Sequence, residues 1–142
     1  LYNCSGTENL ARAAAEANRE GAAKVARFVY VSTLAAGGPC AGTSPRTEID
    51  SDEPVSAYGQ SKKAGEDALF KHGNSYHALV LRAPIVYGPK DPATLILVKS
   101  AAKRIVPKLP SRAADGEKHY SIVHATDLVE ARFHDLGTDK MG

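Results

Sequence analysis

The sequence predicts an α/β fold in which helices alternate with the strands of a parallel sheet. Two observations predict it: apolar runs rich in β-branched residues, and longer polar or alanine-rich segments between them. We expect helices over about residues 5–20, 56–71 and 93–103 and from about residue 126 onward, and strands over 27–33, 77–82 and about 120–123. Such alternation is typical of βαβ units.

The first predicted helix and strand have clear local signals. Five alanines between residues 11 and 17 favour a helix, and Gly21 suits its end. Residues 27–33 (RFVYVST) are dominated by β-branched and aromatic side chains, which predicts a strand that is buried on both faces.

The segment after this strand, about residues 34–55, is rich in Gly, Pro, Ser and Asp and is predicted to be a long loop. Loops longer than about 15 residues are usually functional or mobile. Ser56 is a good N-cap for the next helix. Ligands of parallel sheets bind beyond the carboxyl ends of the strands. Thr33 lies at one such end and residues 83–85 at another, so we expect both on one edge of the sheet.

Composition narrows the class of protein. The chain has 142 residues, 43% hydrophobic and 24% charged, which fits one globular domain. Its net charge is +2 and its basic and acidic residues are interspersed, so nucleic-acid binding is not implied. No apolar run is long enough to span a membrane. There is no signal-peptide pattern and no metal-ligand spacing, and Cys4 and Cys40 suit a reduced cytoplasmic compartment. Because the chain begins at Leu1 and its one methionine is Met141, we expect part of a longer gene product.

A tyrosine and a lysine four residues apart suggest proton-transfer chemistry. Tyr58 and Lys62 share a helix face, so the ammonium can lie near the phenol and favour the phenolate. Tyr58 could then exchange a proton with a substrate hydroxyl or carbonyl, while the Thr33 hydroxyl binds the same oxygen. The bare pair is equally compatible with a surface helix, but here it opens a helix that follows a strand and a long loop.

Five segments resemble one family, the extended short-chain dehydrogenases/reductases, also called the NAD-dependent epimerase/dehydratase group. The matching segments are Asn3 to Leu10 (NCSGTENL), Phe28 to Thr33 (FVYVST), Tyr58 to Lys62 (YGQSK), Leu81 to Pro89 (LRAPIVYGP) and Val123 to Leu128 (VHATDL). They cover nearly the whole chain in the family's order. The resemblance implies the later part of a Rossmann-like, doubly wound parallel sheet within residues 1–142, with residues 90–142 including part of a substrate-binding region.

The resemblance also implies roles for individual residues. Tyr58 would be the catalytic acid/base, Lys62 would bind the nicotinamide ribose, and Thr33 would be the catalytic hydroxyl. Ser32 and the backbone at Pro84, Ile85 and Val86 would contact an NAD or NADP cofactor, and Asn3 would lie near the substrate. Asp127 is more readily explained as a helix-start acid, and His124 and Tyr87 as packed residues.

The chain departs from the family pattern in two places. It has no Gly-rich turn between a strand and a helix, which is where the family binds the cofactor pyrophosphate. The acidic residue that would bind the ribose is also missing, so both NAD and NADP stay open. Leu34 and Ala35 follow Thr33 where the family's 4,6-dehydratases carry Asp-Glu, which disfavours elimination. We therefore expect an oxidoreductase or epimerase for a secondary alcohol or ketone, either a nucleotide sugar or a hydroxysteroid- or flavonol-like compound.

Two alternatives stay open at the level of sequence. A non-catalytic binding or assembly protein could retain the fold. Such a protein is expected to lack part of the Tyr58/Lys62 pair, and this chain has both residues. The family also implies a homodimer through the helices at 5–20 and 56–71. Small residues on both helices suit that pairing, but they would equally suit packing on the sheet; they are Ala13, Ala17, Ala57, Ala64, Gly65 and Ala68.

Overall fold

The computed structural model describes residues 2–40, 44–105 and 120–135, and the chain divides into two compact units, Leu1–Ala83 and Pro84–Gly142. Each unit is an α/β arrangement with a pair of parallel strands. The predicted α/β class with parallel strands is therefore confirmed. The division falls before residue 90, and the assignment of residues 90–142 to a substrate-binding region stays a prediction.

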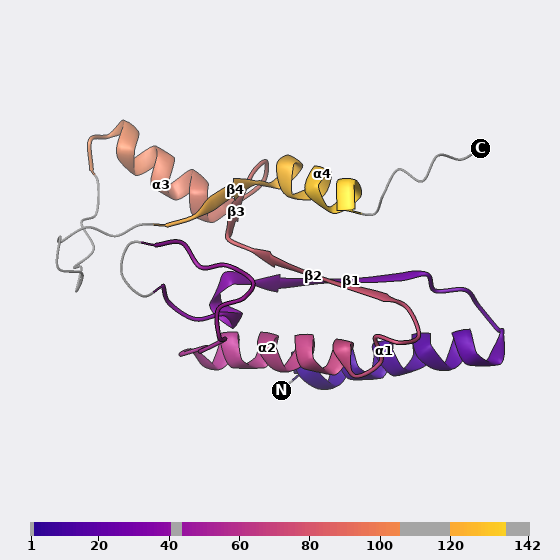
Figure 1. Ribbon diagram of the computed structural model, residues 1–142. Coiled ribbons are helices and arrows are strands. Elements are labelled where there is room, and N and C mark those ends of the chain that lie inside the picture. Colours follow the sequence, from indigo (N-terminus) through magenta and orange to yellow (C-terminus); the bar gives the residue numbers. More distant parts are fainter. Residues whose placement is uncertain (1, 41–43, 106–119, 136–142) are drawn as a thin grey trace. The chain divides into compact units, whose positions relative to one another are not determined.

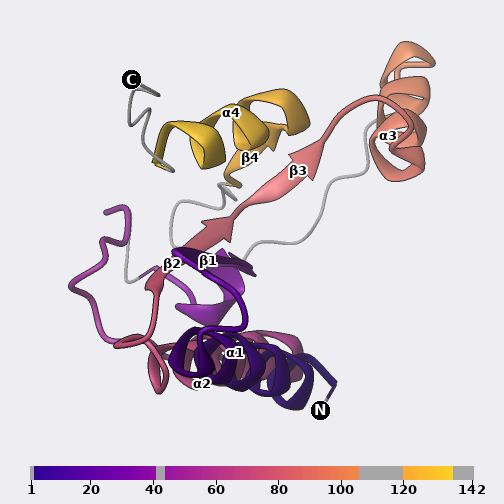
Figure 2. The same ribbon diagram turned by 90° about the vertical axis from the view of Figure 1, so that its right-hand side faces the viewer.

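The first unit is a two-layer arrangement. Its elements are α1 (Tyr2–Glu20), β1 (Arg27–Thr33), the 3-10 helix η1 (Leu34–Ala36), α2 (Ala57–Phe70) and β2 (His77–Ala83). β1 and β2 pair in parallel, from Arg27 opposite His77 to Thr33 opposite Ala83. The helices α1 and α2 lie side by side along one face of this pair (Figures 1 and 2).

The core of the first unit lies between these helices and the strands. Ala11 of α1, Leu69 of α2 and Tyr76 are buried together, and the Tyr76 ring packs against Phe28 of β1 at 5.4 Å between centroids. β1 itself is only half covered, with Ser32 its one buried residue. The prediction of a strand buried on both faces is therefore wrong for this chain, because α1 and α2 cover one face and the described residues of the unit place no helix on the other.

Local sequence signals account for most boundaries in this unit. Ser56 caps α2 as expected, since its hydroxyl accepts a hydrogen bond from the Gly59 N–H at 3.0 Å. Gly21 ends the first helical segment with φ of +69°, a conformation that favours glycine. α1 begins at Tyr2 rather than near residue 5, and β2 continues through Ala83.

The second unit contains β3 (Ile85–Tyr87), α3 (Pro92–Ala102), β4 (Ile122–His124) and α4 (Ala125–Asp135). β3 and β4 are parallel, with Ile85 opposite Ile122. β3 lies where the sequence predicted only a loop. That prediction came from Pro84, Gly88 and Pro89, which stand on either side of three strand residues. No described helix has both the length and the apolar composition that crossing a membrane requires.

Candidate active site

The carboxyl ends of β1 and β2 meet at one edge of the first unit, with Thr33 beside Ala83. This confirms that the two strand ends share an edge. The first turn of α2 packs closely on the η1 turn that follows Thr33. A Cβ atom at Gly59 would lie 2.3 Å from the Ala35 carbonyl oxygen, so only glycine permits this approach. The helix that carries Tyr58 and Lys62 therefore begins against the end of β1.

Tyr58 is the second residue of α2 and is 56% exposed. Its backbone carbonyl accepts a hydrogen bond from the Ser61 hydroxyl at 2.9 Å. The N-cap of Ser56 anchors the same turn. The backbone of Tyr58 is thus fixed, while much of its side chain stays accessible to a small molecule.

The Lys62 side chain reaches from α2 back to β1. Its ammonium donates to the Val31 carbonyl at 2.7 Å and lies 4.3 Å from the centroid of the Tyr30 ring. Among the described residues it makes no hydrogen bond to the Tyr58 phenol. The pair shares a helix face as expected, but the ammonium is held over the strand.

The two hydroxyls at the end of β1 have different environments. Thr33 is half-buried, and its hydroxyl oxygen accepts from the Ala35 N–H at 3.3 Å, which caps η1. Ser32 is buried, and its hydroxyl donates to the Glu66 carboxylate. Thr33 therefore keeps its hydroxyl proton for another acceptor, whereas the proton of Ser32 is already used within the protein.

A partly buried ionic cluster includes Ser32 and lies next to Thr33, and sequence reasoning missed it. The Arg82 guanidinium binds Glu66 through Nε at 3.0 Å and Nη2 at 2.6 Å, and binds Asp52 through Nη1 at 2.6 Å and Nη2 at 2.7 Å. Glu66 is 3% exposed. We call Ser32, Asp52, Glu66 and Arg82 the Arg82 cluster. Its signal in the sequence was an arginine next to a strand end, within the segment LRAPIVYGP.

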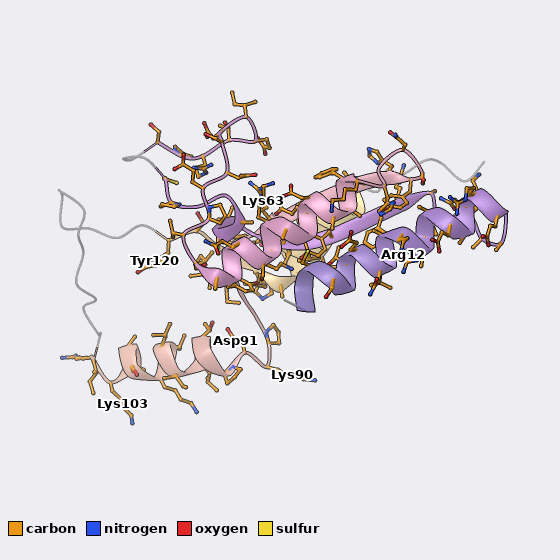
Figure 3. All side chains as sticks on the ribbon, turned by 90° about the horizontal axis from the view of Figure 1, so that it is seen from below. Arg12, Lys63, Lys90, Asp91, Lys103 and Tyr120 are labelled. Atoms are coloured by element: carbon orange, nitrogen blue, oxygen red, sulfur yellow. The ribbon has the colours of Figure 1, made fainter. Side chains whose placement is uncertain are left out.

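The charges of this cluster stabilise one another. Hydrogen bonds and the positive charge of Arg82 lower the pKa of Asp52, and Lys63 and Arg46 act in the same direction. The two carboxylates raise the pKa of Arg82 further above its usual value. Lys63 of α2, labelled in Figure 3, lies 3.7 Å from Asp52 and also pairs with Asp67.

The loop between η1 and α2 closes on itself beside Asp52. The Glu53 N–H donates to the Gly37 carbonyl at 2.8 Å. Gly38 has φ of +90°, and a Cβ atom there would lie 2.1 Å from the Glu53 carbonyl oxygen. Glycine is therefore required where the two ends of the loop meet.

Three of the small residues of α2, Ala64, Gly65 and Ala68, pack within the chain, whereas Ala13 and Ala57 are exposed. A Cβ atom at Gly65 would lie 2.5 Å from the Tyr30 hydroxyl, and Ala68 is 1% exposed. The Sγ of Cys4 lies 3.6 Å from the Ala64 carbonyl, which links α1 to α2. Close approach of α1, α2 and β1 explains these positions without a second copy of the chain.

The remaining predicted residues lie in the second unit or have a side chain that the structure does not describe. Ile85 and Val86 lie in β3 and are exposed, and the Ile85 N–H donates to the Ser121 carbonyl at 3.2 Å. Pro84 precedes them in the second unit. Asn3 is in α1, but its side chain lies outside the described part. The roles of these residues stay predictions.

Two further residues of the second unit pack against each other, and a third lies at the start of a helix. The His124 ring meets the Tyr87 ring edge to face at 5.2 Å, and its Nδ1 accepts from the Thr126 N–H at 3.3 Å. Asp127 lies in the first turn of α4. In the described ranges, no three His, Cys, Asp or Glu side chains are grouped as a metal site would require.

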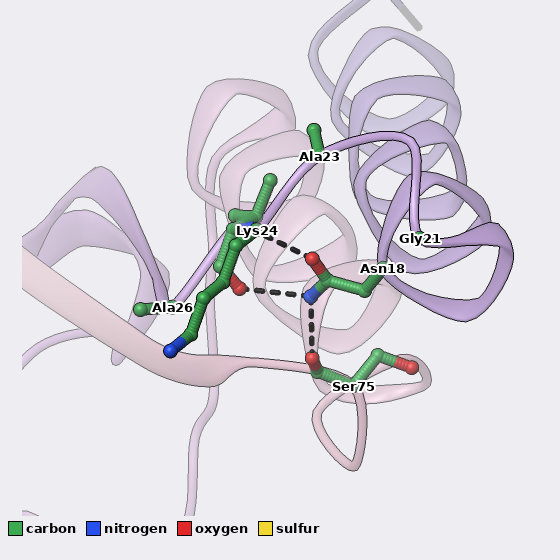
Figure 4. Close-up of a pocket in the computed structure, with 7 residues that line it drawn as sticks. Asn18, Gly21, Ala23, Lys24, Ala26 and Ser75 are labelled. Carbon is green, nitrogen blue, oxygen red and sulfur yellow. Dashed lines mark hydrogen bonds between the residues drawn. The ribbon is translucent and has the colours of Figure 1, made fainter.

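A hollow of about 460 Å³ lies at the opposite end of the strands, between the end of α1 and the start of β1 (Figure 4). Asn18 organises it by donating to the carbonyls of Val25 and Ser75 at 2.8 and 2.7 Å and by accepting from the Val25 N–H at 2.6 Å. The side-chain amide of Asn18 thus joins three segments of backbone. Its lining has no acid–base pair, so we do not regard it as the reacting site.

The residues at the carboxyl end fit the nicotinamide half of a dinucleotide. An exposed phenol, a lysine ammonium and a free hydroxyl proton lie on elements that meet there. This sequence has no matching site for the pyrophosphate half, because it lacks the Gly-rich turn that would bind it.

Comparisons with known proteins agree with this description. The model of the NAD dependent epimerase/dehydratase family matches residues 2–139. A ceramide reductase of Caulobacter vibrioides is 44% identical over 100 residues, which are 70% of this chain and 25% of that protein.

Solved structures show the same fold. A UDP-glucose 4-epimerase of Thermus thermophilus in complex with NAD has a TM-score of 0.68 at 28% identity, covering 98% of this chain and 46% of that one. A UDP-glucuronic acid 4-epimerase of Bacillus cereus in complex with UDP-glucuronic acid and NAD has a TM-score of 0.71 at 24% identity, covering 97% and 42%. The chain thus spans less than half the length of these relatives. It has the Rossmann-type fold of these epimerases, and it belongs to the NAD-dependent epimerase/dehydratase family.

Proposed function

We propose that this chain carries the acid–base half of an NAD(P)-dependent oxidoreductase or epimerase that acts on a secondary alcohol or ketone. One observation carries the proposal: the first turn of α2, which bears Tyr58, packs directly on the η1 turn that follows Thr33. This contact brings the tyrosine-bearing turn and the threonine-bearing strand end to one edge. Family membership supports the same chemistry.

Each residue has a distinct task in this proposal. Tyr58 gives or takes the proton of the substrate oxygen, and the Thr33 hydroxyl donates a hydrogen bond to that oxygen. Lys62 leaves the Val31 carbonyl to bind the ribose hydroxyls of the nicotinamide nucleotide, where its charge favours the phenolate of Tyr58. When bound, the nicotinamide ring accepts or donates the hydride.

The remaining predicted contacts are kept with smaller roles. Pro84, Ile85 and Val86 are proposed to face the nicotinamide through their backbone, and Asn3 to contact the substrate. Ser32 is proposed to contact the cofactor through its backbone, because its hydroxyl already donates to Glu66.

The relatives suggest two substrate classes and one cofactor. The structural relatives named above bind NAD and, in one case, UDP-glucuronic acid, and the curated relative is a ceramide reductase. We propose NAD first and NADP second. A nucleotide sugar and a hydrophobic alcohol or ketone, such as a hydroxysteroid- or flavonol-like compound, are both retained. Leu34 and Ala35 supply no carboxylates after Thr33, so we do not propose elimination.

We also propose a homodimer through α1 and α2 and a cytoplasmic location. Leu10 of α1 and Phe70 of α2 are 65% and 56% exposed, which leaves apolar surface on both helices. The two free thiols, Cys4 and Cys40, support a reducing compartment. Sedimentation of the protein with and without Leu10→Glu tests the dimer, which we expect this substitution to weaken.

Calorimetric titration with NAD and NADP tests the proposed function. It is applied to this chain and to the longest natural protein that contains it. We expect the longer protein to bind, and Lys62→Met to weaken binding by about tenfold or more, because charge-assisted hydrogen bonds are lost. Lys24→Met, an exposed lysine at the opposite end of β1, is the matched control. A correctly folded longer protein that binds neither nucleotide would favour the non-catalytic alternative.

A further inference from the structure

The Arg82 cluster joins four segments of the first unit that the sequence places far apart. Ser32 is the penultimate residue of β1, Asp52 lies in the loop, Glu66 is on α2 and Arg82 is the penultimate residue of β2. Ser32 and Arg82 are directly opposite in the parallel pair, one position before Thr33 and Ala83. Because cross-strand partners in register project to the same face, both side chains meet the carboxylate of Glu66.

Arg82 is bound on two sides at once. It makes one bidentate pair with Glu66 and another with Asp52, with all four donor–acceptor distances between 2.6 and 3.0 Å. The side chains of Arg82 and Asp52 are 28% and 22% exposed. A planar guanidinium fork fixes direction as well as distance, and lysine cannot reproduce two bidentate pairs.

One carboxylate of the cluster is on α2, which bears Tyr58, and the other is in the loop between η1 and α2. Glu66 lies one helical turn after Lys62 and two turns after Tyr58 on the same face of α2. Asp52 adjoins Glu53, whose N–H binds the Gly37 carbonyl just after η1. The direction of α2 and the base of the loop are therefore both tied to the guanidinium.

We propose that Arg82 is a positioning residue for the proposed reaction: by holding Glu66 and Asp52 together, it fixes the Tyr58-bearing helix start against the Thr33-bearing strand end. The inference rests on the proposed function. Arg82 acts through the placement of Tyr58 and Thr33 and touches neither substrate nor cofactor. Loss of the hydrogen bonds between Arg82 and Asp52 lowers turnover, while cofactor affinity is retained.

The discriminating variant is Asp52→Asn, which weakens the loop side of the cluster but leaves Ser32, Glu66 and Arg82 in place. Asp50→Asn is the matched control, because Asp50 lies in the same loop and caps Thr47 without touching Arg82. Both are made in the longest natural protein that contains this sequence. Turnover is measured with NAD or NADP on UDP-glucose, UDP-glucuronic acid and a hydroxysteroid, and NAD affinity is measured by calorimetry.

We expect Asp52→Asn to lower kcat by about tenfold to a hundredfold, with KM and the NAD Kd changed by less than about twofold. Arg82→Lys should lower kcat similarly, Asp52→Glu should restore part of it, and Asp50→Asn should leave it unchanged. Combining Asp52→Asn with Tyr58→Phe should reduce kcat little beyond Tyr58→Phe alone, since both changes remove the same contribution.

Other outcomes separate the two proposals. If Tyr58→Phe abolishes turnover while Asp52→Asn and Arg82→Lys keep parental kcat, the positioning role is overturned and the proposed function stands. Equal losses in every parameter, or additive effects with Tyr58→Phe, would show a structural role only. If the parent turns over none of the probes, or if Tyr58→Phe leaves turnover intact, the proposed function falls and this inference falls with it.

Discussion

The two ends of the β1–β2 pair use the same backbone topology for different purposes. At the amino end, Asn18 joins the backbone of Val25 and Ser75 with neutral hydrogen bonds. At the carboxyl end, three charged side chains and the Ser32 hydroxyl, from four segments, meet in the Arg82 cluster. The hollow that Asn18 organises is at the first end, and the proposed acid–base residues are at the second. We propose that the chemistry takes place at the carboxyl ends of the strands and not in this hollow.

Removing the hydroxyl of Tyr58 gives the largest expected difference in turnover between the two ends of the strand pair. We expect Tyr58→Phe to lower turnover by about 10²- to 10⁴-fold, because general acid–base catalysis is lost, with little change in the free energy of unfolding. Asn18→Ala should do the reverse: turnover is kept, and the free energy of unfolding falls by about 0.5–1.5 kcal/mol as partly buried hydrogen bonds to the backbone are lost. Steady-state kinetics and chemical denaturation measure both. Equal effects on turnover from the two ends would contradict the comparison.

Breaking the Arg82 cluster is the next largest effect. Arg82→Ala leaves the carboxylate of Glu66 buried without its cation, so we expect unfolding free energy to fall by about 3–5 kcal/mol. Arg12→Ala removes an arginine from an exposed pair with Glu16 on α1 and should cost about 0.5 kcal/mol. Urea denaturation compares the two. A similar small loss for both would mean that the cluster is more hydrated than its burial indicates.

Two glycines with positive φ sharpen the comparison further. Gly38→Ala places a Cβ atom against the Glu53 carbonyl and strains φ. We expect the free energy of unfolding to fall by more than the roughly 1–3 kcal/mol that backbone strain alone costs. Gly21→Ala, near the amino end, meets no atom within 4 Å and should cost only about 1–2 kcal/mol. Thermal unfolding of the two variants is the measurement. The reverse order would show that the loop base relaxes more freely than the end of α1.

The smallest expected effect is the pH dependence that Asp52 adds. Arg82, Lys63 and Arg46 face this carboxylate and hold its pKa below the usual 3.8. A carboxylate with a lowered folded-state pKa stabilises the protein above the unfolded-state pKa, and that stability is lost as the pH falls through the folded-state value. The difference in melting temperature between the parent and Asp52→Asn should be constant near neutral pH and shrink below about pH 4. A difference that grows on acidification would contradict this sign.

Sequence alone predicts those parts that depend on local patterns. β1 matches the predicted residues 27–33, and α2 begins after its predicted cap, Ser56, because β-branching and capping act within a few residues. The sequence likewise shows Tyr58 and Lys62 as a motif on one helix face. The resemblance of the whole chain to its family is confirmed by the match over residues 2–139.

What the sequence does not predict depends on distant contacts. Asp52 stands in a loop without periodicity, and nothing local connects it with Arg82, 30 positions later. The Lys62 ammonium binds a carbonyl of β1, 31 positions earlier, because the helix packs over that strand. β3 is three residues long and framed by Pro84 and Gly88, so its pairing with β4 outweighs the local signals for a loop.

The most direct test of the central claim is whether nicotinamide redox chemistry occurs and depends on the carboxyl end of the strands. The measurement is turnover of added substrate by the longest natural protein that contains this chain and by its Tyr58→Phe variant. It follows the ultraviolet absorbance of reduced nicotinamide for an oxidoreductase, and the amount of epimeric product for an epimerase, which returns its hydride and leaves no net reduced cofactor. We predict a change in one of these signals with the parent and none with the variant, although both bind NAD. A change of the same size and rate in both proteins would contradict the assignment of the reacting end.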